Sequence, residues 1–381
     1  MNSSTLVNLR RKLHQHPELS GKESTTSKLI IDELEKYEPD QIMDGLGGHG
    51  VLAIFKPEKG DPDKHILLRA ELDAIAVEEE SKLDYRSESE GVMHGCGHDG
   101  HMAILMGVAE TLKHKRLQNT AVYLLFQPAE EIGEGAEAVM KDKRFENLNI
   151  DHGFAMHNLP GFVEGTVILA DDLFALASTG LAVTFKGRSS HAAYPEEGLN
   201  PVKHLIRMID DLLERFESIR KRDTNAKAVV TYIRLGEKAF GVNPGVAKIG
   251  FTVRASDDRS IQEIVEWTRN KIESGMNSFD GKITFEVVEP FAATINSKEG
   301  NRVVERAVDQ AGMKIEKLNK PFPWSEDFGS FRQKFPVTLF GLGAGIDHPP
   351  LHSERYDFND HLIGKGVQIY SSILSVIDQV Q

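Results

Sequence analysis

"AVYLLFQPAEE", residues 121–131, joins an apolar run directly to a pair of carboxylates. The run 121–127 is apolar on both faces of an extended chain, and "HILLRA" (65–70) and "HGFAMH" (152–157) share this character. Amphipathic helical patterns alternate with these runs, such as the one over residues 3–15 that places Leu6, Leu9 and Leu13 on one face. Apolar strands that alternate with helices predict an α/β fold with a mostly parallel, helix-covered sheet.

The periodicity of apolar residues changes near residue 176. The next segments read in turn as a strand (180–187), a helix opened by Asn200 and Pro201, two strands (227–236 and 247–255), a helix (260–272) and a strand (281–290). The order β-α-β-β-α-β is the ferredoxin-like arrangement. We therefore expect an inserted ferredoxin-like domain at 178–291 and a discontinuous catalytic domain at 1–177 and 292–381.

Composition and charge narrow the possible partners. The 381 residues carry 45 Lys and Arg against 58 Asp and Glu, a formal net charge of −13. This balance argues against nucleic acid and anionic membrane surfaces as partners. We find neither a secretory signal pattern nor an apolar run long enough to span a bilayer, and the only cysteine is Cys96, so a cytoplasmic location is expected.

Metal-ligating side chains follow the ends of the predicted strands. "HGCGHDGHM" (94–102) is too rich in glycine to hold a regular element, and in extended backbone its alternating residues aim His94, Cys96 and His98 to one side. His101 either backs this site or caps the helix expected after it. Five donors exceed what one open catalytic ion takes, so two ions with a shared ligand are expected. The predicted donors are Cys96, His98, Glu131, His157 and His352.

Two further residues have the chemistry of a hydrolase. Glu130, beside Glu131, is placed to accept a proton from an attacking water and return it to a leaving amine. His191, after the first strand of the inserted domain, is placed to donate a hydrogen bond to an oxyanion. Structural alternatives remain open for these residues: an exposed acidic turn for the glutamates, and ordinary hydrogen bonds for His157, His191 and His352.

Seven motifs in order along nearly the whole chain resemble one family. The sequence is similar to the co-catalytic metallopeptidase family M20, in its amidohydrolase branch of hippurate hydrolases, auxin-conjugate hydrolases and N-acetyl-amino-acid deacylases. The motifs are "RRKLHQHPEL" (10–19), "LLRAELDAI" (67–75), "MHGCGHDGHM" (93–102), "FQPAEEIGEGA" (126–136), "HAAYPEEGLNP" (191–201), "SEDFG" (325–329) and "HSERYDFND" (352–360).

The resemblance implies hydrolysis of an N-acyl amino acid to a carboxylic acid and a free amino acid. It implies two divalent ions, with zinc, manganese, nickel and cobalt all open, held by the five donors named above with Cys96 as the bridge. Glu130 falls on the general base, and Asp73 on a carboxylate behind the ligands. His191 falls on a lid histidine that completes the site of a partner subunit in a homodimer formed through the lid. Asn243 and Arg254 fall on lid positions that touch substrate.

Two departures from the family pattern leave the substrate undefined. Glu71 stands where relatives often have aspartate in Asp-x-Asp, and Glu196 stands where a histidine is typical. Three other functions also remain open. These are an amidase with Cys96 as nucleophile and His98 as base, a dipeptidase or aminopeptidase with the same metals, and a metal-binding protein without catalysis.

Overall fold

The computed structural model describes residues 3–275 and 279–379, and the chain divides into two compact units. The first unit takes in the described parts of Met1–Phe174, Thr294–Pro321 and Asp327–Gln381. The second comprises the described parts of Ala175–Ala293 together with Phe322–Glu326. Short strands β7 (Leu173–Ala175) and β14 (Thr294–Ile295) lie where the chain passes from one unit to the other.

The first unit is built on an eight-stranded sheet of order β1-β2-β4-β3-β5-β16-β6-β15. Its centre, β4-β3-β5-β16, is parallel, while β1 and β2 pair antiparallel with their neighbours, as does β6 with β16. The predicted mostly parallel sheet is thus confirmed. The strands are β1 (Gln41–Leu46), β2 (Gly50–Phe55), β3 (Lys64–Glu71), β4 (Thr120–Gln127), β5 (His152–Pro160), β6 (Val167–Leu169), β15 (Ile315–Lys317) and β16 (Val337–Gly345).

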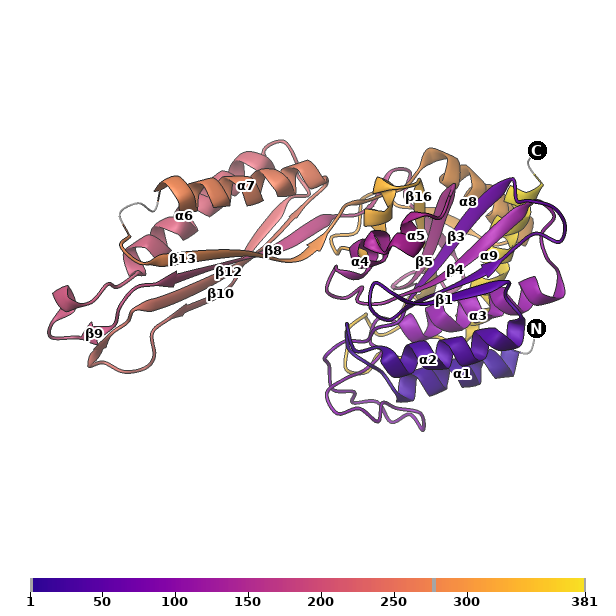
Figure 1. The fold of residues 1–381 in the computed structure, drawn as a ribbon, viewed down its shortest axis with the longest axis horizontal. Coiled ribbons are helices and arrows are strands. Elements are labelled where there is room, and N and C mark those ends of the chain that lie inside the picture. The colour runs from indigo at the N-terminus through magenta and orange to yellow at the C-terminus, as the bar shows by residue number, and fades with distance from the viewer. Residues whose placement is uncertain (1–2, 276–278, 380–381) are drawn as a thin grey trace. The chain divides into compact units, whose positions relative to one another are not determined.

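Helices cover this sheet. In Figure 1, α3 and α9 pack together against the strands and α1 lies on α3, with Leu6, Leu9 and Leu13 buried as predicted. The helices of the first unit are α1 (Ser3–Gln15), α2 (Ser24–Leu34), α3 (His98–His114), α4 (Gly135–Lys141), α5 (Lys143–Glu146), α8 (Lys298–Ala311) and α9 (His361–Asp378), with short 3-10 helices η1 (Glu35–Tyr37) and η3 (Asp327–Gln333).

The sheet order gathers the predicted donors. The carboxyl ends of parallel strands meet at one edge of a sheet. Asp73 follows β3, Glu130 and Glu131 follow β4, His157 lies near the end of β5, and His352 follows β16. Because these four strands are neighbours, the segments that carry the predicted site meet at one edge.

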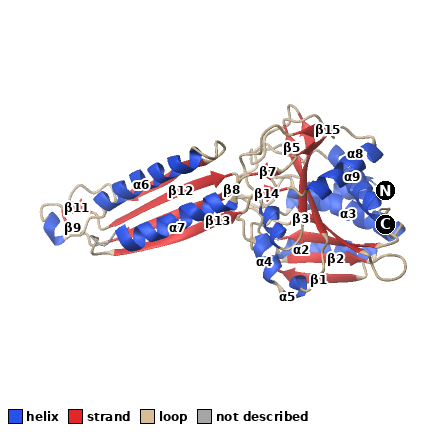
Figure 2. Cartoon of the chain, turned by 90° about the horizontal axis from the view of Figure 1, so that it is seen from above, coloured by secondary structure: helices blue, strands red, loops and turns tan. Residues whose placement is uncertain are grey.

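The second unit has a core of its own, in which β8 buries Leu181, Val183 and Phe185. Its four strands form an antiparallel sheet of order β10-β12-β8-β13, and Figure 2 shows α6 and α7 on one face. The chain order is the predicted β-α-β-β-α-β: β8 (Ala177–Lys186), α6 (Val202–Arg220), β10 (Lys227–Leu235), β12 (Val246–Ala255), α7 (Asp258–Gly275) and β13 (Lys282–Phe291). Smaller elements are β9 (Ser190–His191), η2 (Pro195–Glu197) and β11 (Val242–Asn243).

Two local expectations need correction. The stretch 94–102 leads into a helix that begins at His98, within the stretch and not after it, because Gly97 takes a left-handed conformation (φ +91°) and turns the chain into α3. Residues 322–326, expected in the catalytic domain, belong to the second unit. There the Leu176 amide donates to the carbonyls of Phe322 and Trp324, both at 3.2 Å. Among the described residues, no helix combines the length and apolarity that crossing a membrane requires.

Candidate metal centre

All five predicted donors lie together in the first unit, in two overlapping groups. Donor atoms of Cys96, His98 and His157 lie within 4.8 Å of one another, and so do those of Cys96, Glu131 and His352. These residues come from four separate segments of the chain. Cys96 belongs to both groups, so the thiol occupies the position that a shared ligand requires.

The two buried histidines are oriented by backbone carbonyls. His98 Nδ1 donates to the Asp73 carbonyl at 2.9 Å, and His157 Nδ1 donates to the carbonyl of Asn158 at 2.8 Å. Each ring therefore turns Nε2 toward the other donors, which is how metal-ligating histidines are usually held. The His157 Nε2 atom lies 3.4 Å from Cys96 Sγ. His98 Nε2 is buried and forms no hydrogen bond within the described part of the chain.

His352 and Glu131 form the more open side of the group. His352 Nε2 lies 3.6 Å from Glu131 Oε2, and the histidine side chain is 53% exposed. The backbone of His352 is left-handed (φ +63°), and its amide donates to the Gly95 carbonyl at 2.8 Å. A non-glycine residue held in this conformation stores backbone strain of the kind that concentrates at functional sites. The hydrogen bond ties His352 to the segment that carries Cys96.

Glu130 is presented by a strained turn after β4. Ala129 has φ +52°, and its amide donates to Glu23 Oε1 at 2.8 Å. Burial raises the pKa of Glu23. The Glu130 residue is only 6% exposed, and its Oε2 lies 3.9 Å from His98 Nε2. The predicted general base is thus a buried carboxylate beside the ligand group, and the interpretation of 130–131 as an exposed acidic turn does not hold for Glu130.

Asp73 lies behind the ligands and supports two of them. Its Oδ2 accepts from the Glu131 amide at 3.0 Å and from Ser20 Oγ at 2.7 Å. Its carbonyl accepts from His98, as described above. Burial alone would raise the pKa of Asp73, but its interactions with His98, the Glu131 amide and Ser20 outweigh burial and lower it. The carboxylate is therefore held as an anion that orients both residues.

The electrostatics of the cluster favour a cation. Burial alone would lower the pKa of His98, but the charges of Glu71, Glu131 and Asp73 and a hydrogen bond to Asp73 raise it to about 10. Burial, with the neighbouring His101, lowers the pKa of His157 to about 3, which keeps that ring neutral. A set of one thiol, three imidazoles and one carboxylate suits zinc or a similar transition ion. The residues present therefore fit two divalent ions.

Sequence comparison identifies the family. The chain matches Peptidase family M20/M25/M40 over residues 67–376. The chain belongs to family M20. It is 32% identical over 371 residues to a hippurate hydrolase of Campylobacter jejuni, covering 96% of this chain and 94% of that protein. It is 30% identical over 386 residues to the IAA-amino acid hydrolase ILR1-like 5 of Arabidopsis thaliana, covering 97% and 85%.

A solved M20 structure has the same fold. The Bacillus subtilis YxeP protein, described as a dinuclear metal binding peptidase from the M20 family, superposes with a TM-score of 0.78 at 25% identity and covers 100% of this chain and 99% of that one. This chain is therefore a hydrolase of family M20, and its five clustered donors correspond in number to what a dinuclear centre needs.

A second layer of buried charge supports the metal-site helix of this M20 chain. Asp99, next to His98, accepts from His14 Nδ1 at 2.8 Å and pairs with Arg10 Nε at 3.1 Å. His14 Nε2 lies 3.3 Å from Glu79 Oε2. Burial alone would lower the pKa of His14, but Asp99 and Glu79 raise it to about 9. The motif 10–19 supplies Arg10 and His14, whose role sequence reasoning left unassigned.

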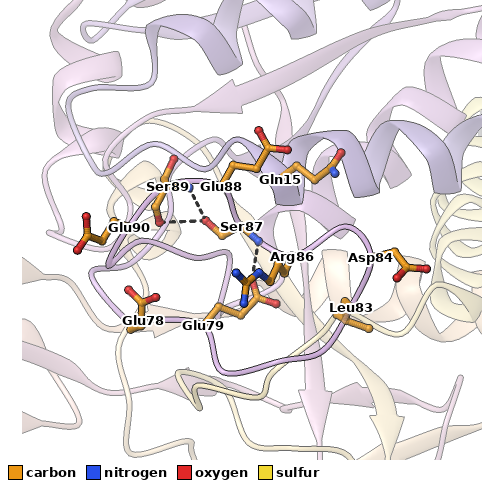
Figure 3. A pocket seen from close by; sticks show the side chains of 10 residues that line it. All are labelled: Gln15, Glu78, Glu79, Leu83, Asp84, Arg86, Ser87, Glu88, Ser89 and Glu90. Carbon is orange, nitrogen blue, oxygen red and sulfur yellow. Dashed lines mark hydrogen bonds between the residues drawn. The ribbon is translucent and has the colours of Figure 1, made fainter.

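Glu79 belongs to a loop that encloses a cavity of about 550 Å³ outside the metal cluster. Figure 3 shows the Ser87 amide donating to the Glu79 carboxylate, at 2.7 Å, and the Ser87 hydroxyl bonded to Ser89. None of the predicted donors lines this cavity. Its lining residues are Gln15, Glu78, Glu79, Leu83, Asp84, Arg86, Ser87, Glu88, Ser89 and Glu90.

The remaining predicted residues belong to the second unit. His191 pairs with Val242 across β9 and β11, and its Nδ1 accepts from the Ala193 amide at 3.0 Å, so the ring proton lies on Nε2. Asn243 Nδ2 donates to Ser190 Oγ at 3.0 Å. Arg254 on β12 donates to Ser325 Oγ at 2.9 Å, and burial lowers its pKa.

His94 departs from its expected orientation. It was predicted to point with Cys96 and His98, yet it joins neither donor group, because residues 94–97 form no strand and the chain bends at Cys96. Its ring lies 6.4 Å from that of His14, and burial lowers its pKa to about 3. Two roles were predicted for His101, and the structure agrees with the one behind the metal site. Its Nδ1 lies 2.7 Å from Glu71 Oε2.

Sequence reasoning missed Arg69, Gln127 and Asp327, which are all fully buried. The sequence does indicate that Arg69 is unusual, since it is a charged residue inside the otherwise apolar run 65–70. A charge in such a position implies a buried partner. No local pattern identifies that partner, because it lies 258 residues away at Asp327.

Proposed function

We propose that this M20 enzyme is a metal-dependent amidohydrolase that cleaves the amide bond of N-acyl amino acids and releases a carboxylic acid and a free amino acid. The observation that carries the proposal is the convergence of Cys96, His98, Glu131, His157 and His352 around a buried Glu130. Relatives named hippurate hydrolase and IAA-amino acid hydrolase support this substrate class.

The residues that would hold two divalent ions are the two overlapping groups, with Cys96 shared. When bound, such ions polarise a carbonyl oxygen and lower the pKa of water. Zinc, manganese, nickel and cobalt are all compatible with thiolate, imidazole and carboxylate donors, so metal availability selects among them.

Glu130 moves the proton in the proposed reaction. Its carboxylate accepts a proton from the attacking water and then delivers it to the nitrogen of the departing amino acid. Burial favours this role because it stabilises the neutral, proton-carrying form of a carboxylate. The strained turn at Ala129 fixes where this carboxylate lies.

The second unit supplies the proposed lid. His191 carries its proton on Nε2, and this exposed donor serves to stabilise the oxyanion of the tetrahedral intermediate. Asn243 and Arg254 are the proposed substrate-binding residues, with the Arg254 guanidinium suited to a substrate carboxylate.

We also propose a homodimer formed through this unit. β10 is an edge strand, and its Val229 and Ile233 are 58% and 51% exposed. An exposed apolar edge strand is an incomplete sheet that favours pairing with another copy. A cytoplasmic location completes the proposal, because ligation requires Cys96 as a reduced thiolate.

Substitution of Glu130 by Gln tests the mechanism. We expect Glu130→Gln to reduce kcat on N-acetyl, N-benzoyl and indoleacetyl amino acids by about 100-fold to 10,000-fold, because the amide accepts no proton. Metal content, measured by plasma mass spectrometry, is expected to stay at the wild-type value. Exhaustive chelation should abolish hydrolysis, and divalent ions should restore it. Full activity of the chelated enzyme would contradict the proposal.

Two alternatives are separated by the same assays. The cysteine amidase was expected to use His98 as its base, but an imidazole at a distance that suits a thiol–imidazole pair is that of His157, whose Nε2 lies 3.4 Å from Cys96 Sγ. A cysteine amidase would turn over with no metal bound. A dipeptidase would require a free α-amino group on the substrate and would reject the N-acyl panel.

A further inference from the structure

A buried ion pair, Arg69 with Asp327, connects the segments that carry the proposed catalytic residues. Arg69 Nη2 donates to Asp327 Oδ1 at 2.7 Å, and both side chains are 0% exposed. We propose that Arg69 and Asp327 are positioning residues that fix the Glu130 turn relative to the strand of His157. This inference rests on the proposed function, since it concerns how the proposed general base is positioned relative to the proposed metal ligands.

Asp327 holds both ends of the turn that presents Glu130. Before the turn, Gln127 Nε2 donates to both Asp327 oxygens at 2.8 Å, and after it the Ala136 amide donates to Oδ2 at 2.9 Å. The two ends are also in direct contact, because a Cβ added at Gly135 would lie 1.7 Å from the Pro128 carbonyl oxygen. One carboxylate therefore closes the loop that contains Glu130.

Arg69 joins this loop to the neighbouring strand. Its Nε donates to Gln127 Oε1 at 3.0 Å, and its Nη1 donates to Glu71. Three separate donors of one planar guanidinium are thus engaged, each with a different residue. A lysine, with its single point of charge, could not hold three partners in this geometry.

A second arm leads from Arg69 to the metal-ligand segment. Glu71 Oε2 lies 2.7 Å from His101 Nδ1, and His101 Nε2 lies 2.6 Å from Asn158 Oδ1. Asn158 follows His157 on β5, and its side-chain Nδ2 donates to the hydroxyl of Tyr356, which lies four residues after His352. The network that starts at the Glu130 turn therefore ends beside two of the proposed metal ligands.

The positions of their hydrogen-bond partners give Arg69 and Asp327 a role beyond packing. Loss of one partner of a buried ion pair destabilises a fold whether or not the pair sets the distance between reacting groups. Here the hydrogen-bond partners named above lie in, or lead to, a segment that carries Glu130, His157 or His352. A displacement of about 1 Å between such groups is enough to reduce a rate by about 100-fold.

The test compares isosteric changes at opposite ends of β4. Asp327→Asn removes the charge at the carboxyl end. Asp378→Asn is the control, since Asp378 accepts from the Gln118 and Asn119 amides and the Thr120 hydroxyl, each at 2.9 Å, at the amino end of the strand. Gln127→Met is a second test variant, which unlinks the turn but leaves both buried charges paired. Each protein is assayed for kcat, KM and melting temperature, and is loaded with Co²⁺ for absorption spectroscopy.

We expect Asp327→Asn and Gln127→Met to lower kcat by about 100-fold with KM within about threefold of wild type, and to change the Co²⁺ d–d spectrum. Asp378→Asn should lower the melting temperature but leave kcat and the spectrum unchanged. If Asp327→Asn and Gln127→Met lower only the melting temperature, the pair is purely structural and the inference is overturned. If the wild type does not hydrolyse N-acyl amino acids, the proposed function fails, while the cobalt spectra still decide the positioning role.

Discussion

Single residues in this protein serve several neighbours at once. Asp73 is the clearest example, since its carboxylate accepts from the Glu131 amide and its carbonyl accepts from His98. Residues that orient metal ligands typically change metal affinity when they are replaced, although they never contact the ion. We therefore expect Asp73 to influence the site through two proposed ligands.

Replacement of Asp73 by Asn should weaken metal binding by about 10-fold to 100-fold, because Glu131 and His98 lose an anionic anchor. Competition with a chelator of known affinity measures the change. Ser20→Ala is the matched control, since Ser20 bonds the same carboxylate oxygen at 2.7 Å without contacting a proposed ligand. Equal metal affinities of Asp73→Asn and wild type would show that the carboxylate does not position the ligands.

His14 makes stability depend on pH. Its pKa is raised from 6.5 to about 9 in the folded chain by Asp99 and Glu79, against the opposing effects of burial and of Arg10. Its contribution to stability is therefore fully present below pH 6.5 and is lost as the pH rises through about 9. The neighbouring His94 ring stays neutral over this range, since its pKa is lowered to about 3.

Urea unfolding of wild type and His14→Gln at several pH values measures this contribution. The difference in unfolding free energy between the two proteins should be about 3 kcal/mol larger at pH 6 than at pH 10, because the raised pKa corresponds to that linkage energy. A difference that does not vary with pH would show that His14 is not held protonated in the folded state.

At the scale of elements, the turn between β4 and α4 matters most. It contains the left-handed Ala129 and ends at Gly135, where any side chain would meet the Pro128 carbonyl. The turn therefore depends on a glycine at its end and on a hydrogen bond from Ala129 to Glu23 at its start. Its geometry decides where Glu130 and Glu131 lie.

Gly135→Ala should lower the free energy of unfolding by about 1–3 kcal/mol and abolish most activity, because the added methyl forces the turn apart. Gly364→Ala in α9 is the matched control, since nothing lies within 4 Å of its added Cβ. That change should raise the free energy of unfolding by about 0.5–1 kcal/mol, as alanine favours a helix interior, and leave activity intact. Normal activity of Gly135→Ala would show that the turn tolerates rearrangement.

At the scale of the whole molecule, each of the two units has a hydrophobic core among its described residues. The first contains α1, α3, α9 and the large sheet, and the second contains α6, α7 and the four-stranded sheet. The proposed metal ligands all lie in the first unit, whereas the exposed apolar residues of β10 lie in the second. The first unit therefore carries the proposed metal centre, and the second carries the proposed lid residues and the proposed dimer edge.

Light scattering coupled to gel filtration tests the proposed assembly. Wild type should elute with twice the mass of one chain, and Val229→Lys should elute as a monomer, because a charge on an edge strand opposes strand pairing. Val163→Lys, at a 49% exposed position in the first unit, should leave the dimer intact. A monomeric wild type would refute the assembly, and the metal-site mutants would be unaffected by that result.

Much of the fold was predictable because the spacing of apolar residues along the chain indicates each helix and strand. Strands apolar on both faces indicated the parallel sheet, and alternating strands indicated the second unit, since side-chain burial repeats with the period of each element. The start of α3 was misjudged because Gly97 adopts a left-handed conformation that no periodicity reports.

The identity of the donor residues was also a property of the sequence, because side-chain chemistry does not depend on folding. The convergence of these donors could not be read from the sequence, since Cys96, His157 and His352 are brought together only by the order β4-β3-β5-β16. The Arg69–Asp327 pair and the path from Asp99 to His14 likewise join residues that are distant along the chain. Such contacts depend on which strands and helices become neighbours, and that choice is made by the packing of the whole core, which no short stretch of sequence specifies.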